Sequence, residues 1–127
     1  MPRTIYRKYG EQSWRFLDAR GLYTIDCVRE YFDVPMDCNT WYYGGKYQYR
    51  GFRPPQCKEG SWLSAHKRGM AFDLKPRKGN VKDMRLKIIE NNLIFPYLTL
   101  IEAKVSWLHL AVENILDCDT SIKIIKP

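Results

Sequence analysis

Residues 64–74, SAHKRGMAFDL, decide both the expected fold and the expected site. From residue 70 to residue 74, large apolar side chains alternate with small or polar ones, which is the period of a β-strand with one apolar face. His66 precedes this strand in a loop, and Gly69 permits a sharp turn between the loop and the strand. We therefore expect the imidazole of His66 and the carboxylate of Asp73 to converge.

The second of the chain's two histidines is His109, which lies within another alternating segment, residues 106–112. A single histidine on a strand is more often a satisfied core or surface residue than a ligand. Two histidines and one carboxylate, however, form a catalytic zinc set whose fourth position is left to water. Ala71 shares the face of Asp73 and leaves room for a metal ion or a substrate. The pattern predicts Zn²⁺ bound by His66, Asp73 and His109.

The remaining elements follow from helical and strand periods. Asp18 is expected to cap a helix that runs to about Phe32, and Asn80 to cap a second helix that runs to about residue 92. Strands are expected at residues 36–42, 70–74, 97–102, 106–112 and 122–125, with a long loop at 46–60 and no clear period in residues 1–17. This order predicts one α+β domain, residues 1–127, with a small, mostly antiparallel sheet and packed helices.

The composition bounds the partners and the location of the protein. The 127 residues carry a formal net charge of +7 and a pI of about 9.3, which favours anionic partners. The aromatic segment 41–49 leaves open a nucleic-acid-binding domain in which these rings stack on bases, but no dense basic run indicates a specific nucleic-acid partner. With no secretory signal at the N-terminus and no membrane-spanning run, we expect a monomer made in the cytoplasm and not inserted in a membrane.

The four cysteines form no C-x-x-C pair, which argues against a structural zinc knuckle. Their even number permits disulfides, but their spacing does not require them. We expect free, mostly buried thiols in a reducing cytoplasm at Cys27, Cys38, Cys57 and Cys118.

Residues 64–73 match the pattern S-x-H-x-x-G-x-A-x-D without a mismatch. This pattern resembles the zinc-binding motif of the DD-carboxypeptidase family of peptidoglycan peptidases, which includes VanX-like dipeptidases and phage endolysin peptidases and is related to the hedgehog signalling domain. Residues 107–110, WLHL, resemble the strand that bears the family's third zinc ligand, and residues 51–55, GFRPP, resemble its G-Y-R-S-P segment. The resemblance covers about residues 16–113.

The resemblance implies a hedgehog-like fold and zinc-dependent hydrolysis of peptide bonds in bacterial peptidoglycan, at D-Ala-containing or L-to-D bonds. It also implies a cell-wall carboxypeptidase or a phage endolysin that reaches the wall after release or delivery. Arg53 would bind substrate or stabilise the oxyanion, with Arg50 as a competing candidate. Ser64 would hydrogen-bond near the zinc ligands.

One departure from the family concerns the general base. Relatives often carry an acidic residue three positions before the last zinc-binding histidine, but this chain has Ser106 there. The hedgehog branch has a glutamate six positions before that histidine, and Glu102, seven positions before His109, resembles it. We therefore expect Glu102 to act as the base. Ser106, together with Ala111 in place of a frequent aspartate, favours the alternative of a catalytically impaired, zinc-stabilised module that binds cell wall or protein.

Overall fold

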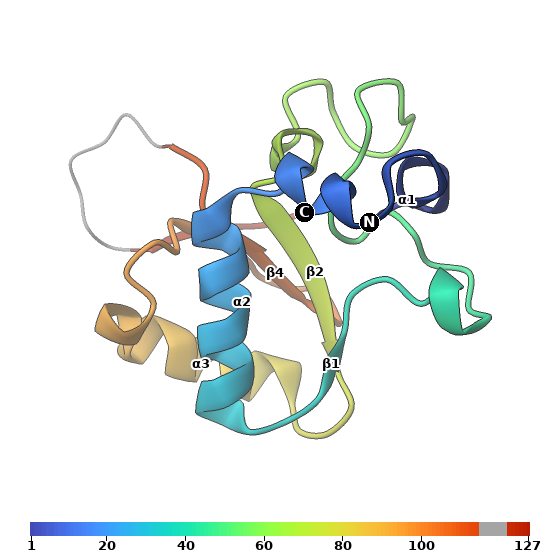
Figure 1. Ribbon diagram of the computed structural model, residues 1–127. Helices are drawn as coiled ribbons and strands as arrows, with labels where there is room; N and C mark the ends of the chain where they lie inside the picture. The colour runs from blue at the N-terminus through green and yellow to red at the C-terminus, as the bar shows by residue number, and fades with distance from the viewer. Residues whose placement is uncertain (115–121) are drawn as a thin grey trace.

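The computed structural model describes residues 1–114 and 122–127 as one α+β domain with three α-helices and a five-stranded sheet (Figure 1). The sheet order is β1-β2-β4-β3-β5. The helices are α1 (Arg3–Tyr9), α2 (Ala19–Phe32) and α3 (Val81–Glu90), and the strands are β1 (Met36–Asp37), β2 (Ala71–Pro76), β3 (Leu100–Glu102), β4 (Leu108–Ala111) and β5 (Lys123–Ile125).

The sheet is mixed, which refines the expectation of a mostly antiparallel one. Within the described residues, β1 with β2, β2 with β4 and β3 with β4 pair in antiparallel fashion, while β5 lies parallel to β3. The alternating period of a segment predicts that it is a strand, but it specifies neither the partner nor the direction of the pairing.

Both predicted helix starts are confirmed. The Asp18 carboxylate accepts a hydrogen bond from the Arg20 amide at 2.9 Å, and the Asn80 side chain accepts one from the Asp83 amide at 3.1 Å. These bonds satisfy amides that a helix leaves unpaired in its first turn. α2 ends where Asp33 adopts a left-handed conformation, φ 49°.

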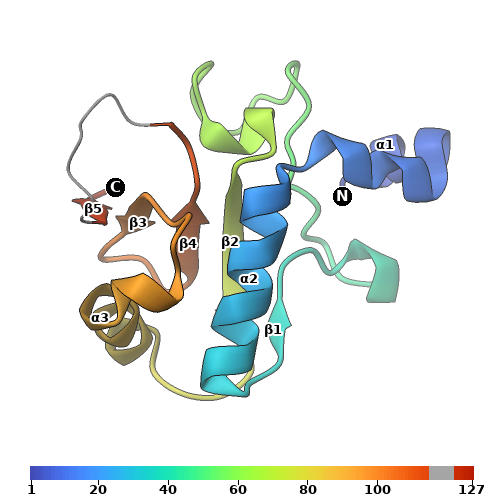
Figure 2. The ribbon, with the colours of Figure 1, turned by 60° about the vertical axis from the view of Figure 1, so that its left-hand side comes forward.

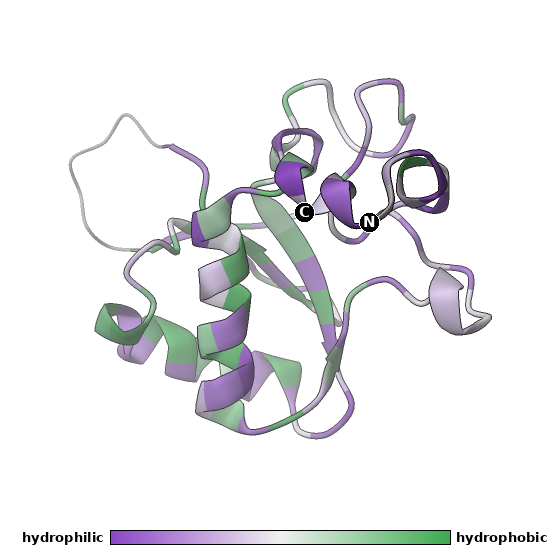
Figure 3. Cartoon of the chain, in the orientation of Figure 1, coloured by the Kyte–Doolittle hydropathy of each residue, from purple (hydrophilic) through white to green (hydrophobic). Residues whose placement is uncertain are grey.

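The main core lies between the two longer helices and one face of the sheet. Val28 from α2 and Met84 and Ile88 from α3 pack against the strands, and α2 runs along β2 (Figures 1 and 2). Figure 3 shows apolar and hydrophilic residues alternating along β2. The sheet residues of this core are Phe72, Leu74, Ile101, Leu108 and Leu110. Because strand side chains alternate, Asp73 and His109 project from the opposite face.

The pairing of β2 with β4 sets the position of the site. Asp73 lies directly opposite His109, and Ala71 lies opposite Ala111. Ala71 and Ala111 are almost completely buried and form a small second cluster with Ala65. This cluster of small side chains lies beside the two polar residues.

The first part of the chain, residues 1–17, shows no clear period in the sequence but forms two helical segments. α1 is followed by a 3₁₀ helix, Gly10–Phe16, and α1 buries none of its residues. In Figure 2, α1 projects away from the sheet. A helix with no buried face needs no apolar period, so the sequence pattern could not reveal it.

The predicted strand at residues 36–42 is wrong beyond its first two residues. Only Met36–Asp37 pair with β2, and Trp41–Tyr43 form a 3₁₀ turn that ends at Gly44 with φ 86°. The Thr40 carbonyl accepts hydrogen bonds from the amides of Tyr43 and Gly45, which closes the turn. The alternation of residues 38–42 therefore arises from a turn and not from a strand.

The other predicted segments are present with shifted limits, and β2 extends to Pro76, past its expected end at residue 74. No helix or strand occurs between Tyr43 and Ala65, as expected for a long loop. The predicted strand 97–102 begins only at Leu100, because a 3₁₀ turn at Asn92–Ile94 and a turn that closes on Leu98 precede it. The strands predicted at 106–112 and 122–125 are each shorter than expected.

The cysteines that the structure describes carry free thiols. Cys27, Cys38 and Cys57 are half-buried rather than fully buried, and Cys118 lies outside the described residues. Within the described part of the chain, no helix combines the length and the apolar character that a membrane span requires.

Candidate metal centre

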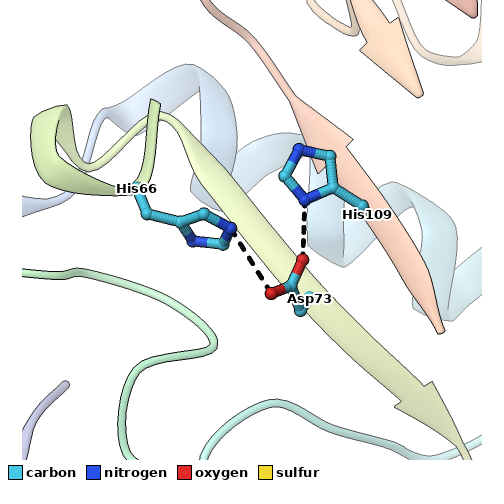
Figure 4. Close-up of side chains that lie close together, drawn as sticks. All are labelled: His66, Asp73 and His109. Carbon is cyan, nitrogen blue, oxygen red and sulfur yellow. Dashed lines mark hydrogen bonds and ion pairs between the residues drawn. The ribbon is translucent and has the colours of Figure 1, made fainter. Parts of the chain in front are cut away.

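Three possible metal ligands meet on the polar face of the sheet (Figure 4). His66 comes from a 3₁₀ helix, Ala65–Arg68, while Asp73 and His109 come from the paired strands β2 and β4. One donor atom from each residue lies within 4.8 Å of the others. His109 Nδ1 is 2.7 Å from Asp73 Oδ1, and His66 Nε2 is 3.4 Å from Asp73 Oδ2.

The orientation of His66 leaves one nitrogen free to bind a metal. This residue is only 3% exposed, and its Nδ1 lies 2.8 Å from the carbonyl oxygen of Gly51. A carbonyl oxygen can only accept a hydrogen bond, so Nδ1 donates to Gly51 and Nε2 is the nitrogen that would bind a metal once it carries no proton. A backbone carbonyl that fixes the tautomer in this way is typical of metal-binding histidines.

Gly69 holds His66 next to the strand that carries Asp73. It ends the 3₁₀ helix with φ 70°, and its amide donates to the carbonyl of His66 at 3.2 Å. A Cβ atom added at this position would lie 2.0 Å from the Phe16 carbonyl oxygen. Glycine is thus required both for the turn, as the sequence predicts, and for the close approach of the segment before α2.

Asp73 is charged at neutral pH, as a metal ligand must be. Burial alone would raise the pKa of its carboxyl group, but hydrogen bonds with His109 and His66 outweigh that effect and hold the pKa far below its usual value. The Arg53 guanidinium lies 3.4 Å from Asp73 Oδ2, and the amide of Asp73 donates to the carbonyl of Arg50 at 2.7 Å.

The guanidinium of Arg53, and not that of Arg50, lies beside the predicted ligands. Arg53 Nε donates to the Tyr49 carbonyl at 2.7 Å, which directs another guanidinium nitrogen toward Asp73. The Arg50 guanidinium instead lies over the ring of Tyr47, 3.5 Å from its centroid. A Cβ atom at Gly60 would lie 2.8 Å from Arg53 Nη1, so the loop packs closely against this arginine.

Glu102, at the end of β3, also reaches the centre. Its Oε2 lies 3.8 Å from His109 Nδ1, and its side chain is 17% exposed. The side chain of Ser64 makes no hydrogen bond with the ligands in the described structure, although it lines the same cavity. The Ser106 carbonyl accepts a hydrogen bond from Lys75 Nζ at 2.5 Å.

A cavity of about 360 Å³ opens over the three ligands and includes Arg53 and Glu102. The sequence interpretation missed Glu113, which lines this cavity and pairs with Arg68. Glu113 lies two positions after Ala111, as Ala111 lies two positions after His109, so the alternation of the segment would have indicated it. Leu63 and Ile125 also line the cavity, and no local pattern in the sequence connects these two residues to the site.

The donor set fits zinc. Zinc in catalytic sites accepts histidine nitrogens and a carboxylate oxygen at about 2.0–2.2 Å. Two such bonds at a tetrahedral angle separate their ligand atoms by about 3.4 Å, and this is the distance between His66 Nε2 and Asp73 Oδ2. A metal ion held by these three residues would keep one position for water or substrate.

Comparison with known proteins gives no relative. No protein-family model matches the chain, no curated protein is detectably similar to it, and no solved structure matches it. The interpretation of the site therefore depends on the chemistry and geometry of its own residues and on the motif that they form.

Proposed function

We propose that the protein is a zinc-dependent peptidase that hydrolyses peptide bonds of bacterial peptidoglycan. The observation that carries this proposal is the position of His66 and His109 on either side of the Asp73 carboxylate, in a cavity that Glu102 and Arg53 also line. Metal ligands, a candidate base and a fixed cation in one cavity form the set of groups that amide hydrolysis requires.

The metal and the base have separate tasks in this proposal. Zinc bound by the three ligands supplies Lewis-acid chemistry and makes water a usable nucleophile near neutral pH. Glu102 accepts the proton of the attacking water and delivers it to the leaving nitrogen. Water thus adds to the carbonyl carbon, the C–N bond breaks, and the products are a carboxylate and an amine.

Arg53 stabilises the negative charge that develops on the carbonyl oxygen. Its guanidinium is always protonated, and the bond to the Tyr49 carbonyl fixes its orientation before substrate binds. Because the Arg53 side chain is only 14% exposed, its charge is poorly screened by water. Its interaction with the transition state is correspondingly stronger than that of a surface arginine.

The substrate class is proposed from the motif. Residues 64–73 resemble the zinc-binding segment of peptidoglycan peptidases that act at D-Ala-containing or L-to-D bonds. The net charge of +7 would favour approach to an anionic cell wall. In this proposal the protein acts at the wall as a carboxypeptidase or a phage endolysin.

The test is hydrolysis of purified peptidoglycan. Wild type with added zinc is expected to release new amino groups or D-Ala from the wall, and chelation or His109→Ala is expected to abolish the release. Hydrolysis by wild type that continues at the same rate in excess chelator would contradict the proposal.

A second candidate is a zinc-stabilised module that binds cell wall or protein without hydrolysis. The observation in its favour is Ser106, which gives no carboxylate at the position where the peptidases that the motif resembles often carry one. A zinc-loaded protein that sediments with peptidoglycan but releases no product would establish this candidate over the peptidase.

A further inference from the structure

A second cavity, of about 530 Å³, adjoins the metal centre. It shares three wall residues with the metal cavity, namely Arg53, Asp73 and Trp107. A ligand whose reacting group lies over the metal ligands can therefore extend directly into this neighbouring space. The sequence interpretation did not predict the second cavity, because the residues that line it come from the long loop, β2 and the segment before β4.

The second cavity is rich in positive charge. Four of its lining residues are cations, and only Glu59 and Asp73 are acidic. The Asp73 carboxylate already contacts both histidines and one guanidinium, so it neutralises little of the remaining charge. The four cations are Lys46, Arg50, Arg53 and Lys75.

Two of these cations are held without a carboxylate partner. Lys75 Nζ donates to the Ser106 carbonyl, and the Arg50 guanidinium stacks on Tyr47. Neither side chain forms an ion pair within 4.0 Å in residues 1–114 and 122–127. Cations that line a concave wall and have no carboxylate partner form an attractive site for an anion.

We propose that this cavity is a carboxylate subsite, in which Arg50 and Lys75 bind a free carboxylate of the peptide while its scissile bond lies at the metal centre. The inference rests on the proposed peptidase function. Peptide substrates can supply such a carboxylate from two sources, the C-terminus or the side chain of an acidic residue.

The spacing along β2 limits where this carboxylate lies in the substrate. Lys75 follows Asp73 by two positions in the same strand, so the two side chains share a face. The rise of a strand separates their Cα atoms by about 6.6–6.8 Å. An extended peptide covers that distance with about two residues. We therefore expect the carboxylate to lie within about two residues of the bond that is cut.

The test measures binding separately from hydrolysis. The probes are N-acetyl-L-Lys-D-Ala-D-Ala, its C-terminal amide, and the amide of N-acetyl-L-Ala-D-Glu, which keeps only a side-chain carboxylate. Each is titrated calorimetrically into zinc-supplemented Glu102→Gln protein, which should not consume the probes. Lys75→Gln and Arg50→Gln are added to this background, and Lys82→Gln is the matched control because Lys82 is exposed on α3 and lines neither cavity.

Glu102→Gln protein with an intact second cavity should bind one carboxylate probe about 10-fold more tightly than the probe that lacks that carboxylate. A difference of this size is typical when one charged hydrogen bond is lost. Lys75→Gln and Arg50→Gln should remove most of this preference, whereas Lys82→Gln should retain it. Preference for the free C-terminus over its amide identifies the first source, and preference for the D-Glu probe identifies the second.

The failure of the subsite and the failure of the peptidase proposal have different signatures. Equal binding of all probes, no binding of any probe, or a preference that survives both cavity substitutions would overturn the subsite, even if wild type hydrolyses peptidoglycan. A carboxylate preference that depends on Lys75 and Arg50 supports the subsite. If wild type with that preference hydrolysed no peptidoglycan, the peptidase proposal alone would fail.

Discussion

Glu102 Oε2 lies 3.8 Å from His109 Nδ1, although seven positions separate the two residues in the chain. Antiparallel pairing of β3 with β4 brings them together. If Glu102 is the general base, Glu102→Gln should retain zinc and the fold but lose on the order of 10²–10⁴-fold in hydrolysis, as is typical when a positioned acid or base is removed. Initial rates on peptidoglycan, with zinc content measured on the same samples, test this prediction.

Ser106→Ala is the control for this prediction. The hydroxyl of Ser106 has no acid–base task in the proposed mechanism, so its loss should change the rate far less. A Glu102→Gln enzyme as active as wild type would show that another group takes the proton.

Zinc should stabilise the fold without being required for it. The core between α2, α3 and the sheet contains none of the three proposed ligands, and the chain is long enough to fold around such a core. A ligand at about 100 times its dissociation constant adds about 2.7 kcal/mol, or on the order of 10 °C for a domain of this size. Thermal melts with zinc and with chelator should both be cooperative, with different midpoints. Loss of the cooperative transition in chelator would refute this prediction.

Gly69→Ala should destabilise the protein strongly. The left-handed conformation alone costs a residue with a side chain about 1–2 kcal/mol, and the Cβ atom would also meet the Phe16 carbonyl at 2.0 Å. Because Gly69 holds His66 in place, the variant should also bind zinc more weakly. Urea unfolding and zinc titration measure the two effects.

Gly44→Ala separates conformation from contact in this comparison. Gly44 is left-handed like Gly69, with φ 86°, and a Cβ atom added there has no neighbour within 4 Å. This variant should lose only the stability that the left-handed backbone conformation costs, and it should bind zinc as wild type does. Equal losses of stability in the two variants would contradict the steric role assigned to Gly69.

Asp18 gives a pH-dependent contribution to stability. The hydrogen bond with the Arg20 side chain is the main reason that the pKa of Asp18 is lowered in the folded protein. This contribution is therefore complete above the unfolded pKa of about 3.9 and is lost as the pH falls through the folded value. Asp18→Ala should cost about 1 kcal/mol at neutral pH through loss of the helix cap.

Asp18→Asn retains a capping oxygen and removes only the charge. Its loss of unfolding free energy relative to wild type should be smaller than that of Asp18→Ala. This loss should be constant between about pH 7 and pH 5 and should shrink below about pH 4. Urea unfolding of wild type and variant across this range provides the check. A deficit that grows toward acid pH would have the wrong sign for the proposed ion pair.

The sequence predicts well the elements whose signals are local. Asp18 and Asn80 are capping residues placed just before apolar helical periods, and both helices begin where these residues indicate. The alternation around Asp73 and His109 likewise places both side chains on one face, and the structure brings them opposite each other. Such features depend on a few neighbouring residues, whose preferences agree with the final fold.

The features that the sequence does not predict depend on contacts between distant segments. α1 has no buried face, while β5 pairs with β3 in a direction that no period specifies. The turn at Trp41–Tyr43 resembles a strand because its residues alternate, but hydrogen bonds to the Thr40 carbonyl fold it back. The second cavity combines Arg50 from the loop with Lys75 from β2, and only the tertiary structure brings these cations together.

The most direct test of the metal centre is the zinc content of the purified protein. Elemental analysis should give about one zinc per chain for wild type under zinc-replete conditions, and far less for His66→Ala, because the buried Nε2 of His66 faces Asp73. Asn91→Ala, which removes a hydrogen bond at the end of α3, should keep the zinc of wild type and serves as the control. Wild type without zinc, or a His66→Ala variant with as much zinc as wild type, would contradict the assignment of His66, Asp73 and His109 as the metal ligands.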